Sequence, residues 1–320
     1  MRRATLPSRE GHAVLENMRA FVSAVESESF SEAARRLRVS ANVVSHRIQM
    51  LEKHLGCRLF NRTTRRMSMT EQGRVFYENV TEALRLIEAA ESNVTELGAM
   101  PRGSLRVTAP LHLGRRLVAP AAARYQEAHP QIDVRLRLSE HTLDLVAESV
   151  DVALRLAAFE DSSMIMRKLA QVDRVVCAAP AYLARAGVPE KPADLPQHQC
   201  LLLRFAGSRE FRWTLMDKGK ELAVPVAGHL EADDGDVLTL WALEGRGLVM
   251  KPRFEIADAL ADGRLVPVLE RHPPAPVTLA VLYPARQLVP LKVKAFADQL
   301  MEEGRRFVAG ELAKIGEKLA

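Results

Sequence analysis

Side chains that can bind nucleic acid are concentrated between residues 34 and 66. This stretch holds nine Arg or Lys residues and a single acid, Glu52. A helix expected after Ser40 carries no apolar residue on its outer face, which consists of Asn42, Ser45, His46, Gln49 and Lys53. Such side chains can contact base edges in the DNA major groove, while cations bind phosphates. The pattern favours a DNA-reading helix over an ordinary solvated face, which is also polar.

A second basic group follows Gly56. The segment from Cys57 to Thr70 is expected to form a β-hairpin wing, anchored by Leu59 and Phe60. Arginines on such a projection suit the narrow minor groove, and threonine hydroxyls can bond to phosphates. The full set of side chains expected to bind DNA is Ser31, Arg35, Ser40, Asn42, Ser45, His46, Arg47, Gln49, Lys53, Arg62, Thr63, Thr64, Arg65 and Arg66.

Short helices are expected to position these side chains. Apolar residues at three- and four-residue spacing predict a first helix over 15–25, behind a tail over 1–14. Ser29 and Glu32 have the form of a capping box, which predicts a second helix over 30–37.

The third helix is expected to begin after Ser40, its N-cap, and to end at Gly56, its C-cap. Its apolar stripe is formed by Val44, Ile48, Leu51 and Leu55. A short helix, a tight turn and a helix with a polar outer face are typical of a helix-turn-helix, whose second helix enters the major groove.

A long helix is predicted over 71–100, after Thr70. Its apolar residues alternate four- and three-residue steps and form a heptad seam: Phe76, Val80, Ala83, Ile87, Ala90, Val94 and Leu97. Such a seam predicts pairing with a second copy of the chain, and the alternative is packing against the chain's own body. Two copies would match a DNA site with two half-sites.

The basic character is confined to the first part of the chain. Residues 1–70 hold 13 Lys and Arg against six acids, and the remainder holds 32 against 34. No apolar signal core is present at the N-terminus, and no window approaches the roughly 18 apolar residues of a membrane span. Three widely spaced cysteines argue against a disulfide framework. We expect a protein of the reducing cytoplasm.

The N-terminal stretch resembles the winged helix-turn-helix of LysR-type transcriptional regulators. The resemblance lies in SFSEAARRL, in the pattern VSxxIQxLE, in LGCRLFNRTTRR and in TEQG at the start of the long helix. It implies promoter binding through residues 1–70 and dimerisation through a linker helix over 71–100. Asn42 and His46 depart from the family, which more often has proline or serine at the first position and a basic residue at the second.

The resemblance continues to about Leu300. Beyond Pro101-Arg102-Gly103, short strand patterns alternate with helical ones, which indicates an α/β unit. The resemblance implies an α+β multidomain protein whose C-terminal domain, over 101–303, is similar to type 2 periplasmic binding proteins. Its two lobes would be lobe I, over 102–177 and 280–303, and lobe II, over 178–279, followed by a helical tail over 304–320.

The resemblance also implies a small-molecule effector between the lobes. The turn after the strand over 105–109 opens a helix and leaves backbone N–H groups at the cleft edge, where an anion would be stabilised. Lys251 stands where many relatives have an apolar residue, so it either faces solvent or favours a carboxylate effector. By this resemblance, the residues expected to line the site are Pro110, Leu111, His112, Phe205, Asp234, Gly235 and Lys251.

Enzymatic and metal sites are not indicated. Phosphate-binding, HExxH and GxSxG motifs are missing. His198 and Cys200 form an HxC pair without a second pair at ligand spacing, which is typical of loop and core residues. Cys177 and Cys200 could form a redox switch, although buried inert thiols are the more common case. No cofactor or metal is therefore expected.

Three classes of function remain. The leading one is a cytoplasmic, ligand-responsive regulator that acts as a homodimer or homotetramer and has double-stranded promoter DNA, the effector and RNA polymerase as its partners. The second is an architectural DNA binder without a ligand. The third, an enzyme or solute-binding protein with a basic appendage, is disfavoured by the missing motifs and signal peptide.

Overall fold

The computed structural model describes residues 9–61, 68–94, 100–140, 150–157, 164–204, 211–284, 289–317 and 319. The chain forms two compact units, Met1–Gly98 and Ala99–Ala320. In the described part of the chain, no helix is long and apolar enough to cross a membrane.

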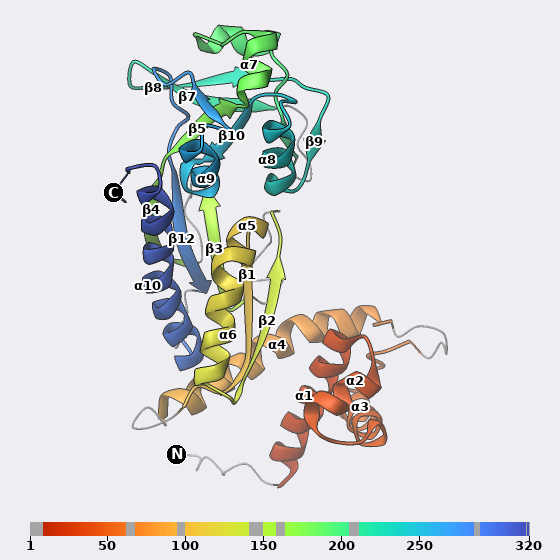
Figure 1. The fold of residues 1–320 in the computed structure, drawn as a ribbon. Coiled ribbons are helices and arrows are strands. Elements are labelled where there is room, and N and C mark those ends of the chain that lie inside the picture. The colour runs from red at the N-terminus through yellow and green to blue at the C-terminus, as the bar shows by residue number, and fades with distance from the viewer. Residues whose placement is uncertain are drawn as a thin grey trace. The chain divides into compact units, whose positions relative to one another are not determined.

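The first unit is helical (Figure 1). Its elements are α1 (Arg9–Ser27), α2 (Phe30–Leu37), α3 (Ala41–Leu55) and α4 (Glu71–Val94). The Ser29 hydroxyl accepts from the Glu32 N–H at 3.3 Å, and Ser40 accepts from Val43 at 3.4 Å. Gly56 ends α3 with φ +69°, a left-handed conformation that favours glycine. These caps confirm the predicted helix starts and stop.

The predicted tail over 1–14 is wrong in its second half, because α1 begins at Arg9. No proline interrupts the chain between Pro7 and the apolar stripe, and the single Gly11 costs a helix only about 1 kcal/mol. The helix therefore extends beyond the residues that its buried stripe requires.

An aromatic cluster organises the core of this unit. The Phe21 ring is fully buried and lies 5.4 Å from the Phe60 ring and 5.6 Å from the Phe76 ring. Val44, Ile48 and Leu51 of α3 pack into the same core, which leaves the opposite side of the helix outward. The predicted apolar stripe of α3 is thereby confirmed.

The heptad seam of α4 divides between two faces. Phe76 and Val80 pack into the core of their own unit, and Val80 is only 3% exposed. These two positions of the predicted dimer seam are therefore wrong: the first turns of α4 cover the helix-turn-helix core, as Leu84 does one turn later. Ala83, Ile87 and Ala90 are exposed, whereas the Val94 side chain and Leu97 lie outside the described residues.

Lobe I of the second unit is built on a five-stranded sheet of order β2-β1-β3-β12-β4. Its strands are β1 (Gly103–Ala109), β2 (Ile132–Leu138), β3 (Val152–Ala157), β4 (Met164–Val172) and β12 (Val277–Pro284). β1 pairs in parallel with β2 and β3, and β12 is antiparallel to β3 and β4. The helical elements packed with it are α5 (Leu111–Leu113), the π-helical turn η1 (Gly114–Val118), α6 (Ala119–Ala128) and α10 (Leu291–Ala313).

Lobe II is built on smaller sheets. β5 (Arg174–Ala178) lies between β10 (Val249–Pro252) and β11 (Val266–Val268). Two strand pairs flank this sheet: β6 (Leu202–Leu203) with β9 (Glu231–Ala232), and β7 (Arg212–Asp217) with β8 (Lys220–Pro225). The helices are α7 (Pro180–Ala186), η2 (Pro192–Gln197), α8 (Gly235–Leu243), η3 (Arg253–Ile256) and α9 (Ala257–Ala261).

The predicted lobe boundaries, 177/178 and 279/280, are each displaced by a few residues. Val172 of β4 still pairs with Val277 of β12, whereas Arg174 of β5 already pairs with Pro252 of β10. The chain therefore changes sheets at Asp173 and has returned to lobe I by Val277. Alternating strand patterns alone do not show which of two adjacent strands belongs to which sheet.

The predicted helical tail over 304–320 is helical through Ala313, but it is part of α10 and not a tail. α10 continues without a break through Ala313, and Val308 is fully buried. The Phe307 ring lies 6.4 Å from that of Phe254, a residue of η3 that joins the lobe I core. Apolar residues at helical spacing continue past residue 303, so the helix keeps a buried face.

Candidate DNA-binding and effector sites

The polar side of α3 is exposed, as the sequence predicts. Asn42, His46, Gln49 and Lys53 are exposed, and Ser45 is half-buried. Ser31, Arg35 and Ser40 are also exposed and precede this surface or lie on α2. The structure thus brings hydrogen-bonding side chains together on one side of α3, opposite its buried stripe. Arg62, Thr63, Thr64, Arg65 and Arg66 lie outside the described residues.

Arg47 departs from the predicted set. Its guanidinium lies 3.1 Å from the Glu16 carboxylate of α1, and its side chain is 25% exposed. Because α1 crosses α3 on this side, Arg47 joins two helices instead of standing on the polar face. Arg35 also has an acidic partner, Glu32, but its side chain remains exposed.

Glu52 is the functional residue that the sequence analysis missed. Glu52 is 8% exposed, and its carboxylate accepts backbone hydrogen bonds from Leu59 at 2.8 Å and from Phe60 at 3.3 Å. The Arg58 guanidinium donates to the same carboxylate at 2.8 Å. The one acid of the basic stretch therefore fixes the start of the wing to α3, and its isolation among cations was the available signal.

The base of the wing is a short antiparallel ladder. Phe60 pairs with Met69, and the Asn61 N–H donates to the Ser68 carbonyl at 2.9 Å. The Thr70 hydroxyl accepts from the Gly73 N–H at 2.9 Å, which caps α4 as predicted. The described residues thus support a hairpin that begins directly after the polar-faced helix.

The predicted effector residues of lobe I lie where β1 meets α5. Pro110 and Leu111 are half-buried, and His112 is 9% exposed. The Leu111 N–H donates to the Glu140 carboxylate at 2.8 Å. Burial raises the pKa of Glu140, and this hydrogen bond opposes the shift. The donor expected to bind an anion thus already holds a carboxylate of the chain.

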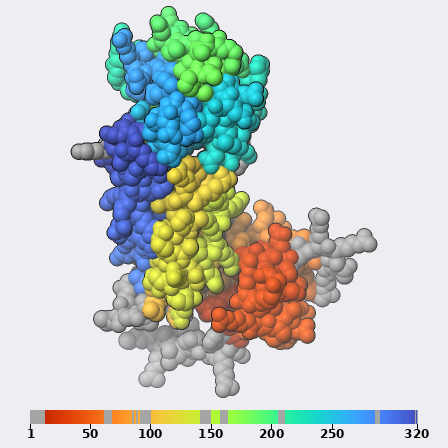
Figure 2. All heavy atoms as spheres, viewed as in Figure 1, coloured from red at the N-terminus to blue at the C-terminus, as the bar shows by residue number. Residues whose placement is uncertain are grey.

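Charged contacts join the two lobes beside this turn. His112 Nδ1 lies 2.8 Å from Asp236 Oδ1, at the start of α8. Arg115 donates to Asp236 at 2.8 Å and lies 3.4 Å from Asp234. The hydrogen bond from His112 is the main cause that lowers the pKa of Asp236 to about 2, although burial opposes it. Figure 1 shows α5 near α8, and the corresponding yellow and cyan atoms meet in Figure 2.

Lys251 lies beneath the start of α8 and does not face solvent. It is 6% exposed, and its ammonium lies 2.5 Å from Glu255 and 3.3 Å from the Gly235 carbonyl. Burial lowers its pKa, but the Glu255 carboxylate outweighs this effect and the pKa is raised. A Cβ at position 235 would lie 2.8 Å from the Lys251 nitrogen, so a side chain there would displace the ammonium.

A second, partly buried cation lies near the end of β1. Arg155 donates to the Thr108 hydroxyl at 3.1 Å. Burial lowers the pKa of Arg155 to about 10, and the Glu140 charge partly offsets that shift. The interlobe region therefore contains both cations and carboxylates, most of them already paired.

The structure brings most of the predicted effector residues together. Pro110, Leu111 and His112 of lobe I lie near Asp234, Gly235 and Lys251 of lobe II, and Phe205 lies outside the described residues. Sequence reasoning missed the charged residues that surround this set: Arg115, Glu140, Asp236 and Glu255. Asp236 and Glu255 had a local signal, because each is close in sequence to a predicted residue.

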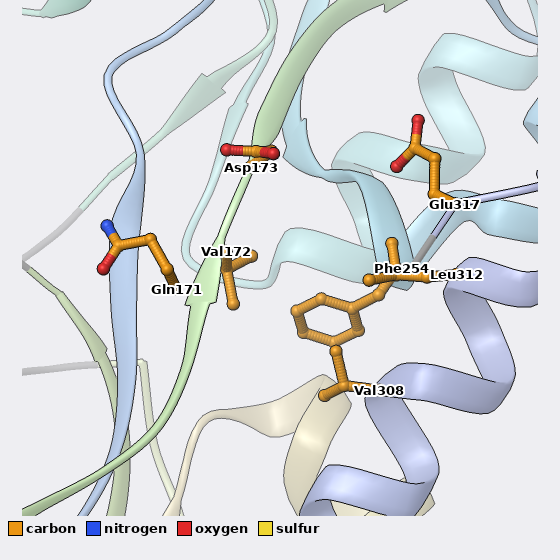
Figure 3. A pocket seen from close by; sticks show the side chains of 7 residues that line it. All are labelled: Gln171, Val172, Asp173, Phe254, Val308, Leu312 and Glu317. Carbon is orange, nitrogen blue, oxygen red and sulfur yellow. The ribbon is translucent and has the colours of Figure 1, made fainter. Parts of the chain in front are cut away.

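A separate groove lies at the hinge (Figure 3). It encloses about 320 Å³, including space open to solvent, and contains none of the predicted effector residues. Val172, Phe254 and Val308 point toward one another in it, with Asp173 and Glu317 at its rim. Its apolar floor belongs to the lobe I core, so we assign it no ligand.

His198, Cys177 and Cys200 have partners or burial typical of structural residues. His198 Nδ1 lies 3.2 Å from the Tyr182 hydroxyl, and Cys200 is buried. Burial raises the pKa of Cys177 and of Cys200 to about 12. Within the described ranges, no group of three or more potential metal ligands occurs.

Comparison with known proteins accounts for both units. Residues 15–74 match the family model for the bacterial regulatory helix-turn-helix protein of the lysR family, and residues 98–305 match the LysR substrate binding domain. The HTH-type transcriptional regulator CrgA of Neisseria meningitidis is 34% identical over 90% of this chain and 96% of its own. DmlR of Escherichia coli, another HTH-type transcriptional regulator, is 31% identical over 90% of this chain and 94% of its own.

Solved structures agree. The structure of CrgA from Neisseria meningitidis covers 93% of this chain and 99% of its own, with a TM-score of 0.56 and 33% identity. The full-length structure of the Vibrio cholerae virulence activator AphB covers 90% of this chain and 98% of its own, with a TM-score of 0.56 and 28% identity. These relatives are regulators and not enzymes. The chain belongs to the LysR-type family of transcriptional regulators, with a DNA-binding helix-turn-helix domain and an effector-binding regulatory domain.

Proposed function

We propose that the protein binds promoter DNA through the outer side of α3 and the wing. The observation that carries this proposal is the exposed polar side of α3 opposite the buried stripe of Val44, Ile48 and Leu51. Glu52 supports it, because it ties the wing to the same helix. Cations of the wing, Arg65 and Arg66 among them, would bind phosphates or the minor groove.

Substitution of base-facing and phosphate-facing residues tests this surface. His46→Ala or Gln49→Ala should change which duplex is preferred in selection from a random pool, because groove contacts specify sequence. Arg65→Ala should weaken binding to all duplexes and lower the salt slope by about one, if the side chain contacts one phosphate. Uniform weakening by His46→Ala and Gln49→Ala would show that α3 presents a different side to DNA.

Homodimers are proposed to form through the outer side of α4, with homotetramers as the next assembly. Ile87 is 38% exposed and Leu86 47% exposed, beside exposed Ala83 and Ala90. Apolar side chains at this spacing on a long helix are covered most simply by a second helix. Phe76 and Val80 are not part of this proposal, since they pack into their own unit.

The effector is proposed to bind between the lobes, near His112. The Nε2 atom of His112 is buried and has no hydrogen-bond partner among the described residues, which favours a polar ligand at this point. A small carboxylate remains the proposed class. Because Lys251 is paired with Glu255, and Arg115 with Asp236, such a ligand must compete with carboxylates of the chain.

A thermal-shift screen of the full-length protein tests the ligand class, with aromatic and aliphatic carboxylates and their neutral amides as probes. A carboxylate at 100 times its Kd should stabilise the protein by about 2.7 kcal/mol. His112→Ala should abolish that stabilisation, and Val188→Ala, at an exposed site, should preserve it. Stabilisation by amides alone would exclude the carboxylate class, and no response to either would favour an architectural DNA binder.

Two further parts of the proposal concern the cellular setting. A promoter-binding regulator meets RNA polymerase on DNA, so we propose RNA polymerase as a partner and the cytoplasm as the location. Co-purification with RNA polymerase on promoter DNA tests this partner. If the two proteins contact each other directly, they should remain together after the DNA is digested. Loss of polymerase on digestion would show that only DNA joins them.

A further inference from the structure

Two apolar side chains are exposed along one edge of α3. Val43 is 39% exposed and Met50 is 43% exposed. Isolated apolar side chains are common on protein surfaces, but these two share one helix within the most basic stretch of the chain. The other exposed residues of α3 are small or polar: Ala41, Asn42, His46, Gln49, Lys53 and His54.

The spacing places the two side chains in one row beside the polar face. Seven residues correspond to nearly two helical turns, so both lie on the same side, about 10.5 Å apart along the axis. At about 100° per residue, Met50 is only about 40° from His46 around the helix, and Val43 about 60°. An object that contacts His46 is therefore within reach of both side chains.

We propose that Val43 and Met50 contact thymine methyl groups in the major groove and thereby select T·A base pairs. This inference rests on the proposed DNA-facing side of α3. Thymine is the base that presents a methyl group in this groove, and apolar side chains recognise it by contact. A separation of about 10.5 Å spans about three base steps of roughly 3.4 Å each.

The geometry favours DNA over a protein as the occupant of this edge. Continuity is the first reason, since the row adjoins His46 on the polar face proposed to read bases. Size is the second, because a stable protein interface buries about 800 Å² on each partner, far more than two side chains provide. A protein seated here would also have to bury the Lys53 ammonium.

Deoxyuridine substitution tests the proposal, because it removes the methyl group of thymine and leaves its hydrogen-bonding pattern unchanged. A duplex first selected from a random pool by the full-length protein is resynthesised with deoxyuridine at one thymine at a time. Burial of one methyl corresponds to about 0.8 kcal/mol, so each contacted thymine should cost about fourfold in affinity. The sensitive positions should be separated by about three base pairs.

Polar variants of similar shape assign the effect to residues. Met50→Gln should abolish the sensitivity at one position, and Val43→Thr should reduce it at the other, with far-UV circular dichroism confirming the fold. Val188→Thr and Leu222→Gln are matched controls, since these residues are 59% and 42% exposed in the other unit. Both controls should retain the fourfold loss.

The outcomes separate this inference from the proposed DNA surface. If His46→Ala and Gln49→Ala change the preferred duplex but no deoxyuridine weakens binding, the methyl contact is refuted and the surface stands. If neither substitution changes the preferred duplex, the surface itself is wrong. A change in sedimentation on Met50→Gln without loss of deoxyuridine sensitivity would assign the edge to a second copy of the chain and overturn the proposal.

Discussion

Replacement of Glu52 distinguishes a structural from an electrostatic account of DNA binding. Loss of this acid makes the basic stretch more positive, and charge alone predicts tighter binding. The structure predicts the opposite. Without the carboxylate, the buried Leu59 and Phe60 N–H groups lose their acceptor and the wing loses its anchor on α3.

The magnitude follows from these contacts. A buried backbone donor left unsatisfied costs about 1–3 kcal/mol, and the Glu52 carboxylate serves one fully buried residue, Leu59, and one nearly buried residue, Phe60. The contact with Arg58 adds little, because that guanidinium is half exposed. We expect Glu52→Ala to destabilise the first unit by about 3 kcal/mol, or roughly 12–24 °C in its melting temperature.

The assay can follow the two units separately, because both tryptophans, Trp213 and Trp241, lie in the second unit. Far-UV circular dichroism should show early melting of helix in Glu52→Ala, while tryptophan fluorescence melts as in wild type. Glu71→Ala is the matched control: it removes the same charge from an exposed site, where the side chain is 69% exposed, and should change stability by less than about 1 kcal/mol. Tighter DNA binding by Glu52→Ala with unchanged melting would refute the reasoning.

The remaining predictions concern the interlobe contacts, the thiols and the dimer. The pKa of Asp236 is lower in the folded than in the unfolded state, so its contribution to stability is present above about pH 4 and lost as the pH falls toward 2. The stability difference between wild type and Asp236→Asn in urea should therefore shrink over that range, and a constant difference would contradict the assignment. A thiol reagent at pH 8 should modify Cys57 alone in the native protein, because burial raises the pKa of Cys177 and Cys200, and should modify all three in denaturant. Ile87→Lys should convert the proposed dimer to monomers in sedimentation at nanomolar concentration, and a dimer that persists in this variant would place the interface elsewhere.

The helix-turn-helix could be predicted from sequence because its signals are local. Ser29, Ser40 and Gly56 act through neighbours within four residues, and their caps occur as expected. The seam of α4 could not be divided by the same reasoning, since Phe76 and Ile87 have the same pattern. What separates them is Phe21 of α1, which packs against Phe76.

The interlobe region shows a second limit of sequence reasoning. The strand-to-helix turn at Pro110 and the start of α8 were both expected to border the site, because the family resemblance places the pocket at these two segments. The partners of their charges were not, since His112 and Asp236 are 124 residues apart in the chain. Lys251 illustrates the same limit: its type indicated a charge, but only the fold shows that Glu255 balances it.

The course of α10 has a practical consequence for hybrid regulators. Beyond the last residue matched by the family model, Lys314 pairs with Asp258 at 2.9 Å and Glu317 with Arg253 at 2.7 Å. A chimera that grafts this sensing domain onto another DNA-binding head and stops at residue 305 would sever both contacts and uncover Phe254. A transferable sensing domain should therefore extend through residue 317. A domain that ends at residue 305 would lack the two ion pairs that hold the end of α10 against η3 and α9.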